Sequence, residues 1–136
     1  MNTHRDFAVL VARILLAAIF IKSGFDKIAG IEGLTGYIAS KGMPFPSLMA
    51  LGAIVVELGG GLLLLVGYRA RWAALAIFLF LIPATLIFHN FWSVAADQVA
   101  GQQTDFFKNV AIMGGMLMVW AFGPGRVALG GDPAPA

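Results

Sequence analysis

Four apolar segments, each close to the length of a membrane-spanning helix, constrain the fold of this chain more than any other feature. They cover residues 7–25, 48–67, 72–89 and 106–122. A helix needs about 17–25 residues to cross the hydrocarbon core of a bilayer. Because backbone polar groups inside lipid must be satisfied within the protein, such segments predict helices rather than open strands. We therefore expect an all-α integral membrane protein, an antiparallel four-helix bundle.

Composition supports a chain that is solvated by the lipid bilayer. Of the 136 residues, 60% are hydrophobic and 12% are charged, and the mean hydropathy is +0.87. These values lie outside the range of soluble globular domains, and the length predicts one transmembrane domain over residues 1–136. The sequence has no basic stripe, which argues against nucleic-acid binding. It also has no cysteine, which excludes disulfides, iron–sulfur clusters and thiol chemistry by this chain alone.

The distribution of Lys and Arg predicts the orientation in the membrane. Four spans place both termini on one side, together with the short turn over residues 67–71. That side carries four cationic residues, Arg5, Arg69, Arg71 and Arg126, against three on the other side, Lys27, Lys41 and Lys108. Because positive residues are enriched in cytoplasmic segments, we predict that both termini are cytoplasmic.

The segments outside the four spans differ in character. Ile31, Leu34 and Ile38 recur at helical spacing in the first outer loop, which predicts a short interfacial helix over Ile31–Ser40 that stops before Pro44 and Pro46. Residues 93–104 are polar and predict a mobile outer loop. The Gly, Pro and Ala residues of 130–136 predict a disordered tail.

A carboxylate, Glu57, lies in the middle of the otherwise apolar run 48–67. An ionisable group near the bilayer centre costs several kcal/mol unless it is paired or faces a protein interior. Depths estimated at about 1.5 Å per residue place Arg13 of the first span several ångströms from it. We predict a buried Arg13–Glu57 ion pair, with Lys22 as the competing partner. A pair of this kind either only locks two helices together or serves a function.

Small residues surround Glu57 along the second span, where Ala53 and Gly61 are each four residues away and Gly59–Gly61 lack side chains. The fourth span offers Ala111 and Gly115 at the same spacing. Small residues predict close helix packing. An alternative is that they leave room for a flat ligand.

A second set of polar residues falls at the outer ends of three spans. The members are Asp26, Lys27, His89, Asn90, Lys108 and Asn109. They either cap and anchor helix ends at the interface or form a polar mouth that binds a ligand. The other histidine, His4, lies on the inner side, so a bis-histidine haem is not predicted. No spacing resembles a metal-ligand set, and we predict no metal site.

The order of several short motifs resembles the DoxX family. They are Arg13, Gly24–Lys27, Lys41–Pro44, Val56–Gly60, Gly67–Arg69, Phe88–Asn90 and Lys108–Asn109. The resemblance covers about residues 7–123 and implies a small four-helix protein of the bacterial inner membrane. Some members of that family are subunits associated with thiosulfate:quinone oxidoreduction, and others accompany redox-defence enzymes.

Two functional hypotheses follow, beside a purely structural role. In the first, the chain is a non-catalytic subunit or scaffold for a membrane-associated redox partner and holds a quinone, with no cofactor of its own. In the second, it is a small transporter or a lipid- or solute-binding module that uses Glu57. The expected partners are the lipid bilayer, a redox protein and further copies of this chain.

Overall fold

The computed structural model describes residues 2–130 and 132, which are helical with no strand among them. The elements follow in the order α1 Thr3–Ala29, α2 Ile31–Ser40, α3 Pro46–Ile54, the π-helix η1 Val55–Gly59, α4 Gly60–Val66, α5 Ala70–Phe88, the 3₁₀-helix η2 Phe91–Ser93 and α6 Val99–Phe122. The predicted all-α class is confirmed.

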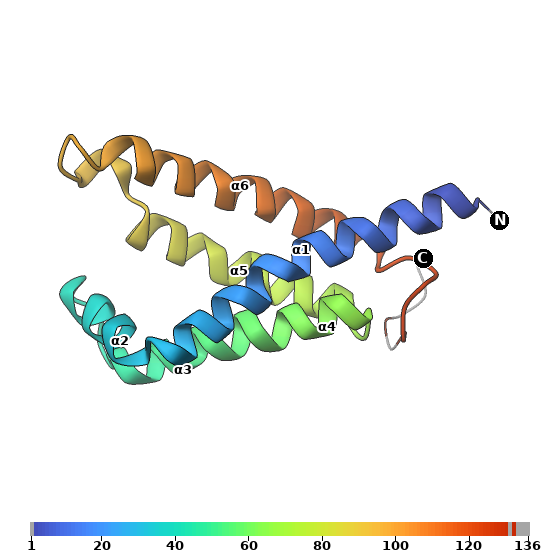
Figure 1. The fold of residues 1–136 in the computed structure, drawn as a ribbon, viewed down its shortest axis with the longest axis horizontal. Helices are drawn as coiled ribbons and strands as arrows, with labels where there is room; N and C mark the ends of the chain where they lie inside the picture. Colours follow the sequence, from blue (N-terminus) through green and yellow to red (C-terminus); the bar gives the residue numbers. More distant parts are fainter. Residues whose placement is uncertain (1, 131, 133–136) are drawn as a thin grey trace.

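Within the described residues, four helical stretches are long and apolar enough to cross a membrane. They are α1, the continuous run α3–η1–α4, α5 with η2, and α6. These correspond to the four predicted segments, although α1 extends beyond both predicted ends. The two described ends of the chain lie at the same end of the molecule, as an even number of spans requires (Figure 1).

The bundle has two ends, the termini end and the loop end. The termini end contains the start of α1, the turn between α4 and α5, and residues 123–130. The loop end contains α2, η2 and the start of α6. Figure 1 shows α1 beside α3 and α4, and α5 beside α6, with the two pairs meeting toward the termini end and diverging toward the loop end.

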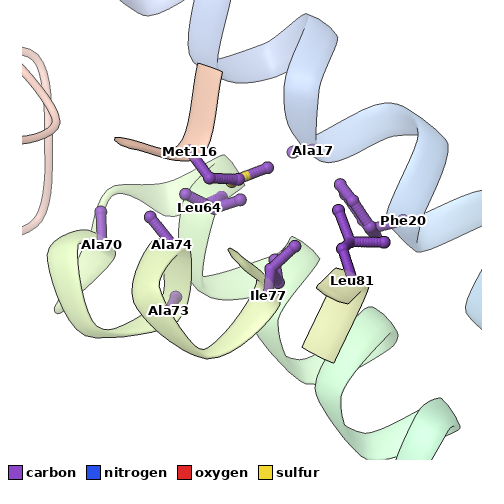
Figure 2. Packing of buried hydrophobic residues seen from close by; sticks show 9 residues of the cluster. All are labelled: Ala17, Phe20, Leu64, Ala70, Ala73, Ala74, Ile77, Leu81 and Met116. Carbon is purple, nitrogen blue, oxygen red and sulfur yellow. The ribbon is translucent and has the colours of Figure 1, made fainter. Parts of the chain in front are cut away.

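The buried apolar cluster lies where the two pairs meet (Figure 2). Its members are Ala17, Phe20, Leu64, Ala70, Ala73, Ala74, Ile77, Leu81 and Met116. Four of the nine are alanines, which allow helix backbones to approach closely. Large apolar side chains such as Leu15 and Met118 are instead 69% and 60% exposed. Small residues in the interior and large apolar side chains on the outside are the arrangement that a lipid-facing surface requires.

Gly60 and Gly61 of the second span are packing positions, whereas a Cβ atom on Gly52 or Gly59 would meet nothing within 4 Å. A Cβ atom on Gly61 would lie 3.0 Å from Ile21 Cγ1, and one on Gly60 would lie 2.9 Å from Ile77 Cδ1. The first span has such a position in Gly24 of α1, where a Cβ would lie 2.7 Å from Leu58 Cβ. Neighbouring helices therefore fill the space beside Gly60 and Gly61, and the structure favours close packing over the flat-ligand alternative at these two positions.

The predicted helix over Ile31–Ser40 is present with those bounds as α2. It ends before Gly42, whose φ is +73°. Phe45, with φ +50°, then caps α3, which begins at Pro46. Tyr37 packs against Phe88 at a ring centroid distance of 5.4 Å. The helix α2 thus reaches the end of α5 across the loop end.

The prediction of a loop over residues 93–104 is wrong for its second half. Helix α6 begins at Val99, and the Gln102 amide donates to the Gln98 carbonyl at 3.0 Å. Aromatic packing beyond the apolar segment holds this extension, since the Phe91 ring lies 5.3 Å from the Phe106 ring. Polar residues outside the membrane continue a helix readily, because their side chains face water.

Part of the predicted disordered tail is bound to the bundle. The Arg69 amide donates to the Gly130 carbonyl at 2.9 Å, and the Gly130 amide donates to the Gly67 carbonyl at 3.1 Å. The Asp132 carboxylate accepts the amides of Ala70 and Arg71 at the start of α5. The prediction is wrong for residues 130 and 132. Residues 131 and 133–136 lie outside the described part of the chain.

Candidate functional site

Glu57 lies in the one π-helical segment of the described chain, η1, and its side chain is 8% exposed. A π-turn widens the backbone by one residue and commonly marks functional positions within helices. Here the turn joins α3 to α4 without a break in the span. The extra residue rotates α4 relative to α3, so the two helices do not present the same face to α1.

The partners of Glu57 come from the last turns of α1. Lys27 Nζ lies 2.9 Å from Glu57 Oε2, and Ser23 Oγ donates to Oε1 at 3.3 Å. Lys27 Nζ also donates to Ser23 Oγ at 2.7 Å. These three residues are called the carboxylate cluster below. The Lys27 side chain is 26% exposed, so the cluster connects a buried carboxylate with the surface.

The predicted Arg13–Glu57 pair is wrong. The Arg13 guanidinium donates to three backbone carbonyls, those of Pro124, Leu65 at 3.4 Å and Val127 at 2.8 Å. The competing partner, Lys22, pairs with Asp26 on the exposed face of α1 instead.

The close contact between Gly24 and Leu58 explains this outcome. It sets the register of α1 against the second span, so that Ser23 and Lys27, rather than Arg13, lie beside Glu57. Arg13 extends toward the termini end, where the segment over residues 123–130 supplies acceptors.

The structure divides the predicted outer polar set into separate groups. Asp26 belongs to the exposed pair with Lys22, and Lys27 belongs to the carboxylate cluster. Asn109 Nδ2 donates to Thr85 Oγ1 at 3.1 Å in a buried contact between α6 and α5. The Oδ1 atom of Asn90 is buried without a hydrogen-bond partner in the described part of the chain.

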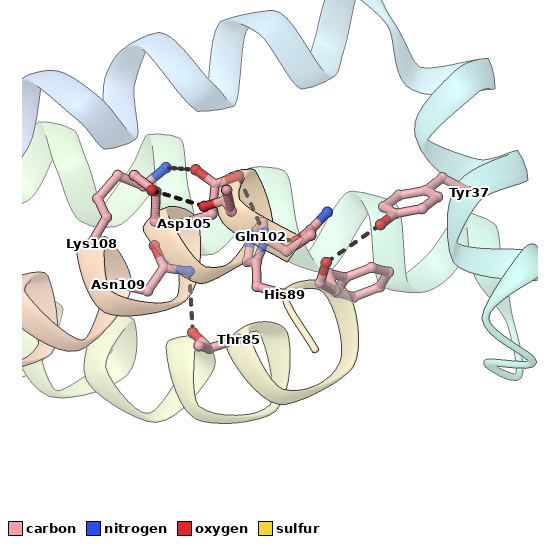
Figure 3. Close-up of polar contacts among 10 residues, drawn as sticks. Tyr37, Thr85, His89, Gln102, Asp105, Lys108 and Asn109 are labelled. Atoms are coloured by element: carbon pink, nitrogen blue, oxygen red, sulfur yellow. Dashed lines mark hydrogen bonds and ion pairs between the residues drawn. The ribbon is translucent and has the colours of Figure 1, made fainter. Parts of the chain in front are cut away.

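His89 and Lys108 meet through two residues that the sequence reasoning missed, Gln102 and Asp105 (Figure 3). His89 Nδ1 lies 2.9 Å from Gln102 Oε1 and 3.8 Å from Asp105 Oδ2. Lys108 Nζ donates to Asp105 Oδ1 at 2.9 Å. These four residues form the loop-end network. Residues 102, 105, 108 and 109 lie on one face of a helix. That spacing would have identified Gln102 and Asp105 if the fourth predicted helix had begun before residue 106.

A cavity of about 450 Å³ opens beside this network between α2 and α6, and we name it the loop-end pocket. Its polar lining consists of Tyr37, Lys41, Gln98, Gln102 and Asp105. Lys41 Nζ lies 5.5 Å from the centroid of the Tyr37 ring. The lining offers a hydroxyl, an ammonium group, amides and a carboxylate, which can orient a polar ligand by hydrogen bonds.

Comparison with known proteins agrees with this architecture. The DoxX family profile matches residues 8–90. The inner membrane protein YphA of Escherichia coli strain K12 is 35% identical over 137 aligned residues, which cover 95% of this chain and 98% of that protein. The inner membrane protein YqjF of the same organism is 34% identical, covering 95% of this chain and 94% of that protein.

A shorter similarity links the chain to a eukaryotic protein. The Surfeit locus protein 4 homolog of Schizosaccharomyces pombe is 30% identical over 69 residues, 49% of this chain and 23% of that protein. No solved structure matches significantly. From the family match, the near full-length bacterial relatives and the four apolar helices, we conclude that this chain belongs to the DoxX family and is a DoxX-type inner membrane protein.

Proposed function

We propose that this chain is a non-catalytic membrane subunit that holds the head group of a quinone for a redox partner protein. The observation that carries the proposal is the loop-end pocket, where donors from α2 and α6 converge at the edge of the membrane-spanning region. Its volume is in the range of small-molecule sites. We assign electron transfer to the partner, since the chain has no cysteine to supply a thiol or ligate an iron–sulfur cluster.

The chemistry of the pocket fits a quinone ring. The two carbonyl oxygens of the ring accept hydrogen bonds, which the Tyr37 hydroxyl, the Lys41 ammonium and the side-chain amides can donate. The Tyr37 hydroxyl makes only a long bond of 3.4 Å to the Phe88 carbonyl and is free to be redirected. The isoprenoid tail would lie along the lipid-facing surface, which is apolar.

A thermal-unfolding experiment tests this proposal. A ligand that binds only the folded state raises the melting temperature. We expect decylubiquinone to raise the melting temperature of the detergent-solubilised protein. Tyr37→Phe should weaken the apparent affinity about fivefold, because one hydrogen bond contributes roughly 1 kcal/mol. Tyr68→Phe, the same change at the termini end, is the matched control. No shift at saturating quinone, or equal weakening by Tyr68→Phe, would contradict the proposal.

The carboxylate cluster supports a second candidate, a small transporter in which Glu57 exchanges a proton. Ionisable residues inside membrane spans mark functions that include proton relays, and the buried Glu57 is paired with the partly exposed Lys27. Proteoliposomes containing an internal pH dye and driven by a potassium diffusion potential would detect proton entry. Wild-type protein should acidify the vesicles faster than Glu57→Gln or empty liposomes. Equal rates in all three would exclude proton transport under these conditions.

A further inference from the structure

A second cavity, of about 610 Å³, opens at the termini end, and nothing in the proposed function uses it. Its wall combines the first turns of α1, the start of α5 and the segment after α6. Its cationic side chains are Arg5, Arg71 and Arg126, and its larger apolar side chains include Val9 and Phe122. This cavity is called the arginine pocket below. The start of α1 and the segment after α6, which line it, lie at the opposite end of the bundle from α2 and the start of α6 (Figure 1).

The arginines of this pocket have no acidic partner among residues 2–130 and 132, since none of the three forms an ion pair within 4.0 Å there. Asp6 and Asp132 also line the cavity. The carboxylate of Asp132 is already bound to the backbone amides of Ala70 at 2.9 Å and Arg71 at 3.0 Å. The lining therefore carries an excess of positive charge, three cationic side chains against two acidic ones.

Arg71 provides the most specific observation. Its Nε atom is buried and has no hydrogen-bond partner among the described residues. The guanidinium packs against the Gly123 backbone, because a Cβ atom on Gly123 would lie 3.3 Å from Nε and 3.5 Å from Nη2. Because Gly123 has no side chain, the Arg71 guanidinium fits against its backbone. The Nε–H donor of Arg71 has no acceptor there among the described residues. Buried donors are normally satisfied. Arg71 lines the cavity, so its guanidinium can donate to an acceptor bound there.

The acceptor that matches this arrangement is a phosphate group. Planar guanidinium groups bind phosphate oxygens through paired hydrogen bonds, and several arginines together favour an anion. The pocket lies where the membrane-spanning helices end, at the level of lipid head groups. Its apolar lining includes Phe122, which is 70% exposed. Basic pockets between membrane helices commonly hold anionic lipid head groups.

We propose that the arginine pocket binds the phosphate group of an anionic phospholipid. The site joins the start of α1 and the start of α5 to the segment after α6, so a bound phosphate would connect three parts of the chain that are distant in sequence. This inference concerns the termini end and does not depend on quinone binding at the loop end.

Binding of short-chain lipids to the purified full chain tests the proposal. The probes are dioctanoyl-phosphatidylglycerol, dioctanoyl-phosphatidylcholine and inorganic phosphate, each titrated by calorimetry into protein in a non-ionic detergent. The variants are Arg71→Gln and Arg126→Gln. The matched control is Arg69→Gln, since Arg69 lies in the same turn but outside the pocket, with its guanidinium carbon 5.8 Å from the Tyr68 ring centroid. Circular dichroism and size-exclusion chromatography verify that each variant is folded.

We expect phosphatidylglycerol to bind the wild-type protein at least tenfold more tightly than phosphatidylcholine. Arg126→Gln and Arg71→Gln should each weaken that binding about tenfold, and Arg69→Gln less than twofold. If inorganic phosphate also binds and the pocket variants weaken it, the site accepts the group from either source. If it does not, the lipid is the ligand. Equal affinity for the two lipids, or equal losses in Arg69→Gln and Arg126→Gln, would overturn the proposal. Arg126, an exposed residue outside the helices, keeps the test valid if Arg71→Gln fails to fold.

Discussion

The two ends of the bundle stabilise a buried charge in different ways. At the termini end, Arg13 is 3% exposed and donates to backbone carbonyls of α4 and of the segment after α6. Toward the loop end, the Glu57 carboxylate is held by the side chains of Ser23 and Lys27. A backbone carbonyl cannot change its charge or leave without moving the chain. A serine or lysine side chain can rotate, and a lysine or a carboxylate can exchange a proton.

Packing follows the same division. The buried apolar cluster that fixes the helices to one another lies where the two helix pairs meet (Figure 2). Toward the loop end, the contact between α5 and α6 includes the polar pair Thr85 and Asn109 (Figure 3). We therefore expect the termini end to act as a fixed structural clamp and the loop end to be the more adjustable of the two.

The largest effect is expected from breaking the carboxylate cluster. Lys27→Met leaves the Glu57 carboxylate buried without its cation, which should lower the free energy of unfolding by about 3–5 kcal/mol. Replacing both partners, with Lys27→Met and Glu57→Leu together, should restore most of that loss, because no unpaired charge remains. Denaturant unfolding in detergent micelles measures both. If the double variant is as unstable as the sum of the single ones, Lys27 and Glu57 are not coupled.

A smaller effect is expected from releasing the clamp. Arg13→Met removes the charged donor from the carbonyls of Leu65, Pro124 and Val127. Each hydrogen bond to a charged group contributes roughly 1.5–3 kcal/mol, but the desolvation cost of the buried guanidinium offsets part of the three bonds, so we expect a net loss comparable to one such bond. The specific signature is faster proteolysis within residues 123–130, which Lys27→Met should not produce. If proteolysis within residues 123–130 is as slow in Arg13→Met as in the wild-type protein, Arg13 does not hold this segment.

The smallest effect is expected at the exposed pair on α1. The side chains of Lys22 and Asp26 are 77% and 62% exposed. Exposed ion pairs contribute about 0.2–1 kcal/mol, so Lys22→Gln should change the free energy of unfolding by no more than that. It also serves as the control for Lys27→Met, since both residues are lysines of the same helix. A loss above about 1 kcal/mol would mean that Lys22, the competing partner in the sequence prediction, does stabilise Glu57.

Much of the fold could be predicted because it depends on local pattern and on the lipid environment. The four spans, the short helix Ile31–Ser40 and the meeting of both termini at one end follow from hydropathy, helical spacing and an even number of crossings. The start of α6 could not be predicted, since residues 102–105 are polar and the aromatic packing that follows them, of Phe91 against Phe106, is a tertiary contact. The side of the membrane that each end faces stays a prediction from the Lys and Arg distribution.

The candidate site was predicted only in part. The burial of Glu57 followed from residue type and depth, and antiparallel topology predicted that His89 lies at the same end of the bundle as Lys108. The partners of Glu57 did not follow, because the depths were counted from assumed span ends, and the ends of neighbouring helices need not be level. Gly24, which packs against Leu58, lies eleven residues beyond Arg13, about 16 Å along α1 at about 1.5 Å per residue. Gln102 and Asp105 were missed because the helix that aligns them with Lys108 was not expected to begin at Val99.

The sequence by itself determined that this chain crosses a membrane as helices and that Glu57 faces the protein interior, because lipid solvates neither backbone polar groups nor a carboxylate. Only the tertiary structure decided which residue pairs with Glu57. The close contact of Gly24 with Leu58 sets the register of two helices, and that register selects Lys27. It also decided the role of Arg13, whose partners are backbone carbonyls. Every residue carries a backbone carbonyl group, so the pattern of side chains does not show which carbonyls accept hydrogen bonds from Arg13.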